Sequence, residues 1–290
     1  MASTAVSAVA PGDGEGTTDE VSDARHETSE LPSGSALQED FGLFALAGGA
    51  HNPLPGADGG IRCECARCAA WTLYISHGGP GGVRQYEVFT REFVDALARA
   101  ISALAAALHA SLDARALRVL ELGAGSGRLA HHLRAALAQL GCGSDSLLVI
   151  ASDISPATGH FPLHFPVLES DYRASLARCL PDVVLVSWMP LGQDWSACIR
   201  STPSVKAFFL VGETSGALCG DAQYTWGRAA RGTTAQPTVP ARVGGWTMRE
   251  LAEVSMVQLC MIDEPWDNVR HSRTVLSVRD ERTLALLHES

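Results

Sequence analysis

The stretch from Val119 to Ala130 (VLELGAGSGRLA) constrains the fold more than any other part of the chain. Residues 117–122 are mostly apolar and end at a glycine, which predicts a strand buried on both faces. Three glycines at alternate positions then predict a tight turn that a ligand can approach closely: Gly123, Gly125 and Gly127. A helix is expected from Arg128 to about Leu140, with its first N–H groups directed at the ligand. Strand, turn and helix in this order predict a cofactor site at the carboxyl end of a strand in an open α/β sheet.

The spacing of the glycines separates two kinds of nucleotide site. A dinucleotide site has the spacing G-x-G-x-x-G, with the third glycine inside the helix. In this chain the spacing is G-x-G-x-G, and it is preceded by an acid, Glu121. The pattern E/D-x-G-x-G-x-G resembles motif I of the class I S-adenosylmethionine (SAM) methyltransferases. The resemblance implies SAM as the cofactor, held in part by Glu121, Gly123, Ala124, Gly125 and Gly127.

Two further acids end the next strands expected along the chain. One apolar run ends at Asp153, and a shorter run ends at Asp171. An acid in the first position can accept hydrogen bonds from both ribose hydroxyls of a cofactor, and in the resembling family the next residue, here Ile154, packs on adenine. In the same family an acid in the second position accepts the adenine amino proton, which assigns this role to Asp171, with Tyr172 beside it. The alternative for Asp153 is a simple turn or helix-start signal within the sequence D-x-S-P.

Residues 181–190 (PDVVLVSWMP) are the most apolar segment and predict a strand whose carboxyl end lies over the reacting centre. The final letters, SWMP, do not match the Asn/Asp-Pro-Pro-aromatic motif of nucleic-acid amino methyltransferases, so methylation of a base amino group is not implied. Ser187 and Trp188 are expected at the catalytic centre, where Trp188 would form an apolar or cation-attracting wall beside the sulfonium. Asp194 is a candidate base, and capping of the next helix is its alternative role.

These elements predict an α/β fold. We expect a doubly wound, seven-stranded, mainly parallel sheet with an antiparallel last strand and helices on both faces. A helix from Gln85 to about Ser111 precedes the first strand, and in the resembling family such a helix helps to cover the cofactor. Tyr86, at its start, is expected either to contact substrate or to pack in the core. A helix at 247–254 and two strands at 255–262 and 273–278 are expected to close the sheet.

Three regions are expected along the chain. Residues 1–40 carry nine acids and one arginine among small polar residues, which is typical of a disordered acidic tail. Residues 41–84 form an N-terminal extension with a cysteine-rich loop, and residues 85–290 form the SAM-dependent methyltransferase domain. Within that domain, residues 214–245 are a long glycine-rich connection and a candidate substrate-facing insertion.

The cysteine-rich loop contains the spacing Cys63-x-Cys65-x-x-Cys68, which resembles half of a zinc or cluster site. A tetrahedral zinc ion needs a fourth ligand, which His51 or His77 could supply. No second C-x-x-C follows, and three reduced cysteines beneath a loop are the alternative. Zinc binding by these cysteines is left open, and methyl transfer itself requires no metal.

Composition narrows the classes of function. The net charge is −10, of which residues 1–40 hold −8, so the rest of the chain carries −2. No basic stripe is present, which disfavours a dedicated nucleic-acid binder. The N-terminus lacks the pattern of a signal peptide, and no apolar run reaches the length of about 18 residues that a membrane span needs. A cytoplasmic protein without a membrane partner is expected.

Together these features predict a methyltransferase that moves the methyl group of S-adenosyl-L-methionine to an acceptor, with a small molecule or a protein favoured over nucleic acid. One alternative is a non-catalytic binding or scaffold protein with the SAM fold, which the intact motif I disfavours. The other is a nicotinamide-dependent oxidoreductase, which the G-x-G-x-G spacing disfavours. The sequence identifies neither the acceptor, the methylated atom nor the oligomeric state.

Overall fold

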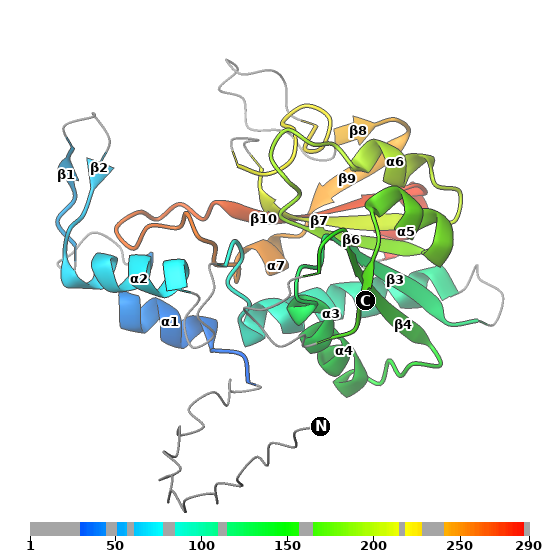
Figure 1. Cartoon of the computed structure of the whole chain (residues 1–290), viewed down its shortest axis with the longest axis horizontal. Helices are drawn as coiled ribbons and strands as arrows, with labels where there is room; N and C mark the ends of the chain where they lie inside the picture. The colour runs from blue at the N-terminus through cyan, green and yellow to red at the C-terminus, as the bar shows by residue number, and fades with distance from the viewer. Residues whose placement is uncertain are drawn as a thin grey trace, which may run out of the picture.

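The computed structural model describes residues 30–44, 51–56, 61–77, 85–109, 115–156, 165–214, 218–227 and 241–286. Its main body is an eight-stranded sheet with helices packed around it (Figure 1). Across the sheet the strands follow the order β5-β4-β3-β6-β7-β10-β9-β8. Their bounds are β3 Leu117–Leu122, β4 Leu147–Asp153, β5 Val167–Glu169, β6 Val183–Ser187, β7 Ala207–Glu213, β8 Ala241–Val243, β9 Trp246–Glu250 and β10 Ser272–Val278.

Neighbouring strands from β5 to β7 are parallel, and β10 is antiparallel to both β7 and β9. The register pairs Leu122 of β3 with Ser152 of β4 and with Val186 of β6, so three strands end side by side. This arrangement confirms the predicted fold class, a doubly wound and mainly parallel sheet with helices on both faces. The short strand β8 adds an eighth strand at the edge, antiparallel to β9.

The helices cover both faces of the sheet because successive strand residues point to opposite sides. On β3, Val119 joins the apolar core beneath one face, and Leu120 joins the core beneath the other. The first core is formed with α3 Arg91–His109, α4 Arg128–Gln139 and α7 Ala252–Ser255. The second is formed with α5 Tyr172–Cys179 and α6 Ser196–Ser201. Among the described residues, no helix is both long and apolar enough to cross a membrane.

The helix expected from Gln85 begins later, at Arg91 of α3. Two contacts explain the delayed start. Glu87 forms an isolated antiparallel bridge with Cys260, so this part of the chain is extended. The side chain of Thr90 then accepts the N–H of Phe93 at 3.2 Å, as a capping residue does.

The helix expected at 247–254 is confirmed only at its end, where Ala252–Ser255 form α7. Trp246–Glu250 is strand β9, because Trp246 and Met248 pack in the same core while the backbone pairs with β10. The spacing Thr247-x-x-Glu250 resembles a helix capping box, whereas apolar residues at alternate positions indicate a strand. The strand expected at 255–262 is absent: Ser255 ends α7, and residues 256–262 form turns and irregular structure with a single bridge at Cys260.

A smaller layer precedes the sheet in the chain and lies to one side of it (Figure 1). It comprises α1 Gly34–Phe41, a hairpin of β1 Leu54–Pro55 and β2 Ile61–Arg62, and α2 Ala66–His77. The last described helix is α8 Glu281–Leu286. The disordered tail expected at residues 1–40 is wrong for its last part, because residues 34–40 belong to helix α1. Ser33 caps this helix, and the Glu92 carboxylate accepts both Ser33 Oγ at 2.7 Å and the Gly34 N–H at 2.6 Å.

Candidate functional site

The glycine turn follows β3, as the sequence predicts. Gly123, Gly125 and Gly127 have φ angles of +70°, +56° and +74°, which L side chains rarely adopt. A Cβ at Gly127 would lie 2.8 Å from Val167 Cγ2 and 2.9 Å from the Phe165 carbonyl oxygen. A Cβ at Gly125 would meet nothing within 4 Å. Gly127 therefore permits close packing, whereas Gly125 borders open space.

Asp153 ends β4 and joins that strand to the glycine turn. Its Oδ2 accepts the N–H of Gly125 at 2.8 Å, and its Oδ1 accepts the N–H of Ser155 at 2.8 Å. A carboxylate has about four lone-pair sites, so each oxygen keeps one for a further donor. The predicted acid is thus fixed in place with acceptor capacity to spare.

Glu121 lies inside the protein, and its side chain is 3% exposed. Burial raises the pKa of its carboxyl to about 8, opposed by the N–H of Ala130 and assisted by the charge of Asp153. Its Oε2 has no hydrogen-bond partner among the described residues. A buried polar oxygen without a donor is costly, so this position is one where a ligand or water would gain by donating.

A cavity of about 400 Å³ opens beside the carboxyl ends of β3, β4 and β6. This volume lies in the range of about 300–1,000 Å³ that small-ligand sites occupy. Seven residues predicted from the sequence line it: Gly123, Asp153, Ile154, Asp171, Tyr172, Ser187 and Trp188. The fold therefore brings residues from four separate strand ends, those of β3, β4, β5 and β6, to one cavity.

The other predicted site residues do not line this cavity: Glu121, Ala124, Gly125, Gly127 and Asp194. The carboxylate of Asp194 accepts the N–H and the hydroxyl of Ser196, and it lies 3.9 Å from the guanidinium of Arg200. These contacts correspond to the capping role that the sequence left as the alternative for Asp194. We therefore leave Asp194 out of the proposed chemistry.

Asp171 has both a structural contact and a place at the cavity. Its Oδ1 accepts the N–H groups of Arg173 at 2.9 Å and Ala174 at 3.2 Å, which caps α5. Because the carboxylate is fixed at the helix start, it is held at the cavity wall. The cap and the predicted contact with a ligand are compatible, since the second oxygen is a further acceptor.

Trp188 follows β6 and has a left-handed backbone, with φ at 55°. A bulky residue in this region is strained, and such strain persists only where surrounding contacts enforce it. Its backbone N–H donates to the Val211 carbonyl at 2.8 Å, and its indole Nε1 donates to Glu87 Oε2 at 2.8 Å. The indole ring is therefore held in one orientation at the cavity wall.

Glu87 is a buried residue of the site region that sequence reasoning missed. Besides Trp188, its carboxylate accepts Ser272 Oγ at 2.6 Å and Gln258 Nε2 at 2.9 Å. Burial raises the pKa of this carboxyl to about 7, against the lowering effect of its three donors. The sequence signal was an acid between aromatic and apolar residues, in YEVF, just before the long helix.

A second aromatic wall was also missed. Trp195 stacks on Tyr172 with ring centroids 5.0 Å apart and planes 15° apart. The guanidinium of Arg173 lies 4.6 Å from the centroid of the Tyr172 ring on the cavity lining. Trp195 also packs against Gly123, where an added Cβ would lie 3.2 Å from the indole. Its only sequence signal was an aromatic residue soon after the fourth predicted strand.

The long connection at 214–245 contributes no described residue to the cavity lining. Residues 215–217 and 228–240 lie outside the described residues. Trp226 is buried, and its Nε1 donates to the Cys219 carbonyl at 2.8 Å, which is a packing role. The expected substrate-facing role of this connection therefore stays a prediction.

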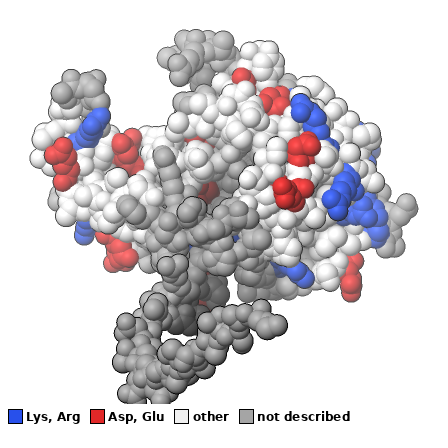
Figure 2. All heavy atoms as spheres, in the orientation of Figure 1, with Lys and Arg blue, Asp and Glu red and all other residues white. Residues whose placement is uncertain are grey.

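Tyr86 lies at the edge of the site. Its ring is 56% exposed and its centroid lies 5.6 Å from that of Trp188. On the face drawn in Figure 2, basic and acidic side chains of the described residues both occur, and several basic ones gather at the right-hand side.

Comparisons with known proteins add little beyond the fold. No family model matches the sequence, and no curated protein matches it. The carbon methyltransferase CurJ is 12% identical, with 73% of this chain and 58% of that chain covered and a TM-score of 0.37. The carbon methyltransferase DszA is 14% identical, with 65% and 54% covered and a TM-score of 0.37. The magnesium protoporphyrin IX methyltransferase of Synechocystis, solved with bound SAM, is 16% identical, with 73% and 96% covered and a TM-score of 0.33.

The chain spans little more than half the length of the two carbon methyltransferases. Likenesses with such low identities and TM-scores lead to no conclusion about activity or substrate. The fold assignment rests on the strand order of this chain itself, which is that of a doubly wound, mainly parallel sheet.

Proposed function

We propose that this chain binds SAM in the cavity beside β3, β4 and β6 and transfers its methyl group to an acceptor. The main support is the carboxylate of Asp153, which lines the cavity and is bonded to Gly125 of the G-x-G-x-G turn. An acid at this strand end, beside such a turn, is the expected partner for ribose hydroxyls.

Two observations support the fit of the residues to SAM. The buried Oε2 of Glu121 lacks a donor, and SAM carries an ammonium group that can donate. The position next to Gly125 is open, so a ligand can approach the backbone there without a side chain in the way. Both features lie in motif I.

We assign the remaining contacts by position along the cavity. Asp153 would accept the ribose hydroxyls, while Asp171, Tyr172 and Ile154 would surround the adenine. Trp188 and Ser187, which follow the buried strand β6, would lie beside the reacting groups. When bound, SAM supplies an activated sulfonium methyl group.

The protein's contribution to transfer would be orientation and exclusion of water. Glu87 fixes the indole of Trp188 at 2.8 Å, and that ring presents an apolar face that attracts a sulfonium cation. Trp195 and Tyr172 form a second aromatic wall. We propose a small molecule or a protein as acceptor, because the sequence contains no basic stripe.

Calorimetric titration with SAM, S-adenosylhomocysteine and NADH tests this function. Wild-type protein is expected to bind the first two with Kd values on the order of micromolar and to show no binding of NADH. Asp153→Asn keeps the size of the side chain but removes its charge, so SAM affinity should fall about 100-fold, as expected for two lost charge-assisted hydrogen bonds.

Asp145→Asn is the matched control, because Asp145 is an exposed residue of the turn that precedes β4 at its other end. It should leave affinity unchanged. A folded wild-type protein that binds none of the SAM compounds would overturn the proposal, and NADH binding would favour an oxidoreductase. Binding of SAM without transfer in a screen of acceptors with labelled SAM would favour a scaffold.

A further inference from the structure

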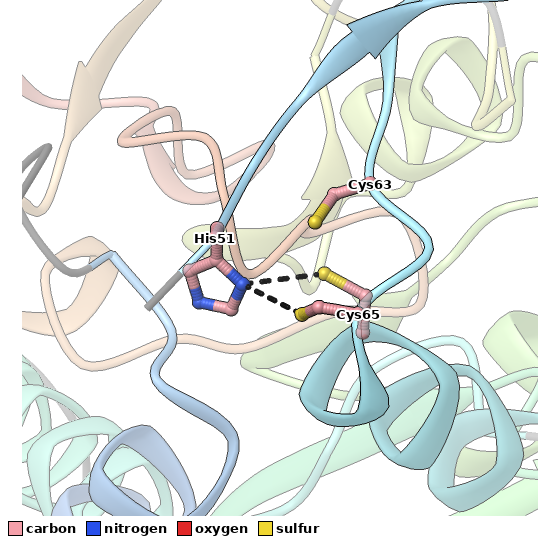
Figure 3. Close-up of side chains that lie close together, drawn as sticks. His51, Cys63 and Cys65 are labelled. Carbon is pink, nitrogen blue, oxygen red and sulfur yellow. Dashed lines mark hydrogen bonds between the residues drawn. The ribbon is translucent and has the colours of Figure 1, made fainter. Parts of the chain in front are cut away.

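Four side chains with metal-binding atoms meet in the smaller layer, away from the cavity residues. They are His51, Cys63, Cys65 and Cys68, and one ligand atom from each lies within 4.8 Å of all the others. Figure 3 shows the ring of His51 turned toward the sulfur atoms, with Cys63 and Cys65 on the facing chain. None of the four lines the cavity, so the proposed methyl transfer leaves them without a role.

The local fold explains how residues from separate segments converge. Strands β1 and β2 pair as an antiparallel hairpin, with Leu54 opposite Arg62. His51 precedes the first strand and Cys63 follows the second, so the hairpin brings them together. Cys65 stands at the start of α2, where its carbonyl accepts the N–H of Ala69 at 3.0 Å, and Cys68 lies in the first turn.

The hydrogen bond of His51 fixes which ring nitrogen is free to bind a metal. Its Nε2 lies 3.1 Å from the carbonyl oxygen of Gly42, and because a carbonyl can only accept, Nε2 carries the proton. Nδ1 is therefore the ring nitrogen left for a metal, and it faces the sulfurs, 3.2 Å from Cys65 Sγ and 3.4 Å from Cys68 Sγ. In a metal-bound histidine, the ring nitrogen that does not bind the metal usually donates its N–H to a carbonyl or carboxylate oxygen.

These distances agree with a shared metal ion. Zinc–sulfur bonds of about 2.3 Å and zinc–nitrogen bonds of about 2.0–2.1 Å place tetrahedral ligand atoms roughly 3.5–3.8 Å apart. The two separations from His51 Nδ1 need to change by only a few tenths of an ångström, and the remaining ligand atoms lie within 4.8 Å of one another. We propose that His51, Cys63, Cys65 and Cys68 form a tetrahedral zinc site that holds the hairpin to the start of α2.

The types of ligand indicate which metal the site binds and whether that metal is structural or catalytic. Three thiolates and one imidazole are typical of structural zinc sites, and they fill all four positions so that none is open for catalysis. Iron–sulfur clusters are usually held by four cysteines, and only three are available here.

The hairpin also needs a stabilising element. Each of its strands has two residues, and both residues of β1 are exposed. A two-stranded hairpin without a buried face is marginal in water at best. A zinc ion bound by residues on both of its ends would supply the missing stabilisation.

The test uses the full chain, purified without added metal and under reducing conditions. Elemental analysis should find about one zinc ion per chain. Wild-type protein stripped by a chelator and titrated with Co²⁺ should show the d–d bands of a tetrahedral site and thiolate-to-cobalt charge transfer, and Zn²⁺ should then displace the cobalt. This arm uses no variant, so a folding defect cannot obscure it.

Variants then identify the ligands. His51→Ala and Cys65→Ser should each lose the bound zinc and the tetrahedral cobalt spectrum. Cys142→Ser should keep both, because Cys142 contacts Ser102 and not the cluster. Gly42→Ala should weaken zinc binding about 10-fold, because its Cβ would lie 2.9 Å from His51 Nε2 and displace the ring.

Three outcomes would overturn the proposal. One is wild-type protein that contains no zinc and gives no tetrahedral cobalt spectrum. Another is iron in place of zinc in the purified protein. The third is a disulfide among Cys63, Cys65 and Cys68 that persists under reducing conditions. SAM titration of the same samples is a separate measurement, so failure of either proposal leaves the other testable.

Discussion

The cavity region and the hairpin region both bring distant residues within hydrogen-bonding distance, but they do so by different means. The cavity stands on parallel strands that are deeply buried: every residue of β7 is buried, as are four of the five residues of β6. The hairpin has strands of two residues each, both residues of β1 are exposed, and the apolar cluster of its layer is small. Apolar burial positions Asp153 and Trp188, whereas ligand chemistry positions His51 and the cysteines. The two regions should therefore respond differently to the same perturbation.

Removal of the bound zinc ion should produce the largest difference between the two regions. A chelator should speed amide hydrogen exchange of described residues 51–56 and 61–77 by about 100-fold or more, because a ligand at 100 times its Kd suppresses opening by that factor. Exchange in β3 and β4 should be unchanged, and SAM affinity should stay within about 10-fold. Hydrogen exchange with mass spectrometry checks this. Equal acceleration in both regions would show that they unfold as one unit.

Replacement of glycine should have the next largest effect, and it tests packing on the cavity side. Gly127→Ala adds left-handed strain and a Cβ 2.8 Å from Val167 Cγ2, so it should lower the free energy of unfolding by about 2–4 kcal/mol. Gly125→Ala adds only the left-handed strain, so it should lower the free energy of unfolding by about 1–2 kcal/mol. Its main effect should be weaker SAM binding. Urea unfolding measures the loss of stability in each variant, and SAM titration measures the loss of affinity. Equal losses of stability would contradict the packing argument.

A matched pair of tryptophan changes should have a smaller effect. Trp71 Nε1 donates to the Asp263 carbonyl at 2.6 Å and joins α2 to the segment between α7 and β10, while Trp226 Nε1 donates to the Cys219 carbonyl at 2.8 Å. Each Trp→Phe change leaves a buried carbonyl unpaired and should cost about 1–3 kcal/mol. Trp71→Phe should speed hydrogen exchange in α2 and leave SAM affinity unchanged. If it lowers SAM affinity more than Trp226→Phe does, the two regions are coupled through this contact.

Titration of the Glu87 carboxyl should change the stability of the protein less than the substitutions above. Its pKa is raised by burial to about 7, so the folded protein binds more protons than the unfolded chain between the ordinary pKa of 4.5 and 7. The stability that this carboxyl contributes is complete below pH 4.5 and is lost as pH rises through 7. Glu87→Gln cannot titrate and should flatten the fall in stability over this range. Thermal unfolding across pH measures it, with the exposed Glu253→Gln as control, and an unchanged slope would contradict the assignment.

The sequence was most informative where one local pattern decides the structure. The apolar runs, the three glycines and the acids at strand ends predicted β3 and β4 and seven of the residues that line the cavity, because each pattern depends on neighbours in sequence. Glu87 and Trp195 were missed because their roles depend on partners far along the chain: Glu87 on Ser272 and Gln258, and Trp195 on Tyr172.

The same reason explains the remaining differences. Trp246–Glu250 was predicted as a helix because a local capping pattern was followed, while the pairing with β10 that makes it a strand is not local. The metal-binding cluster was left open because His51 and Cys63 meet only through the hairpin. A pattern within one segment could therefore be read, and a contact between segments could not.

The position of β10 has a consequence for how the protein is made. This strand comes last in chain order among the described strands, yet it lies between β7 and β9 within the sheet. On a ribosome, β7 and β9 emerge earlier and their facing edges stay without a partner until residues 272–278 have been released. Unpaired strand edges are templates for association between chains. Nascent chains that stall before residue 272 should therefore depend on chaperones more strongly than chains that stall after residue 278.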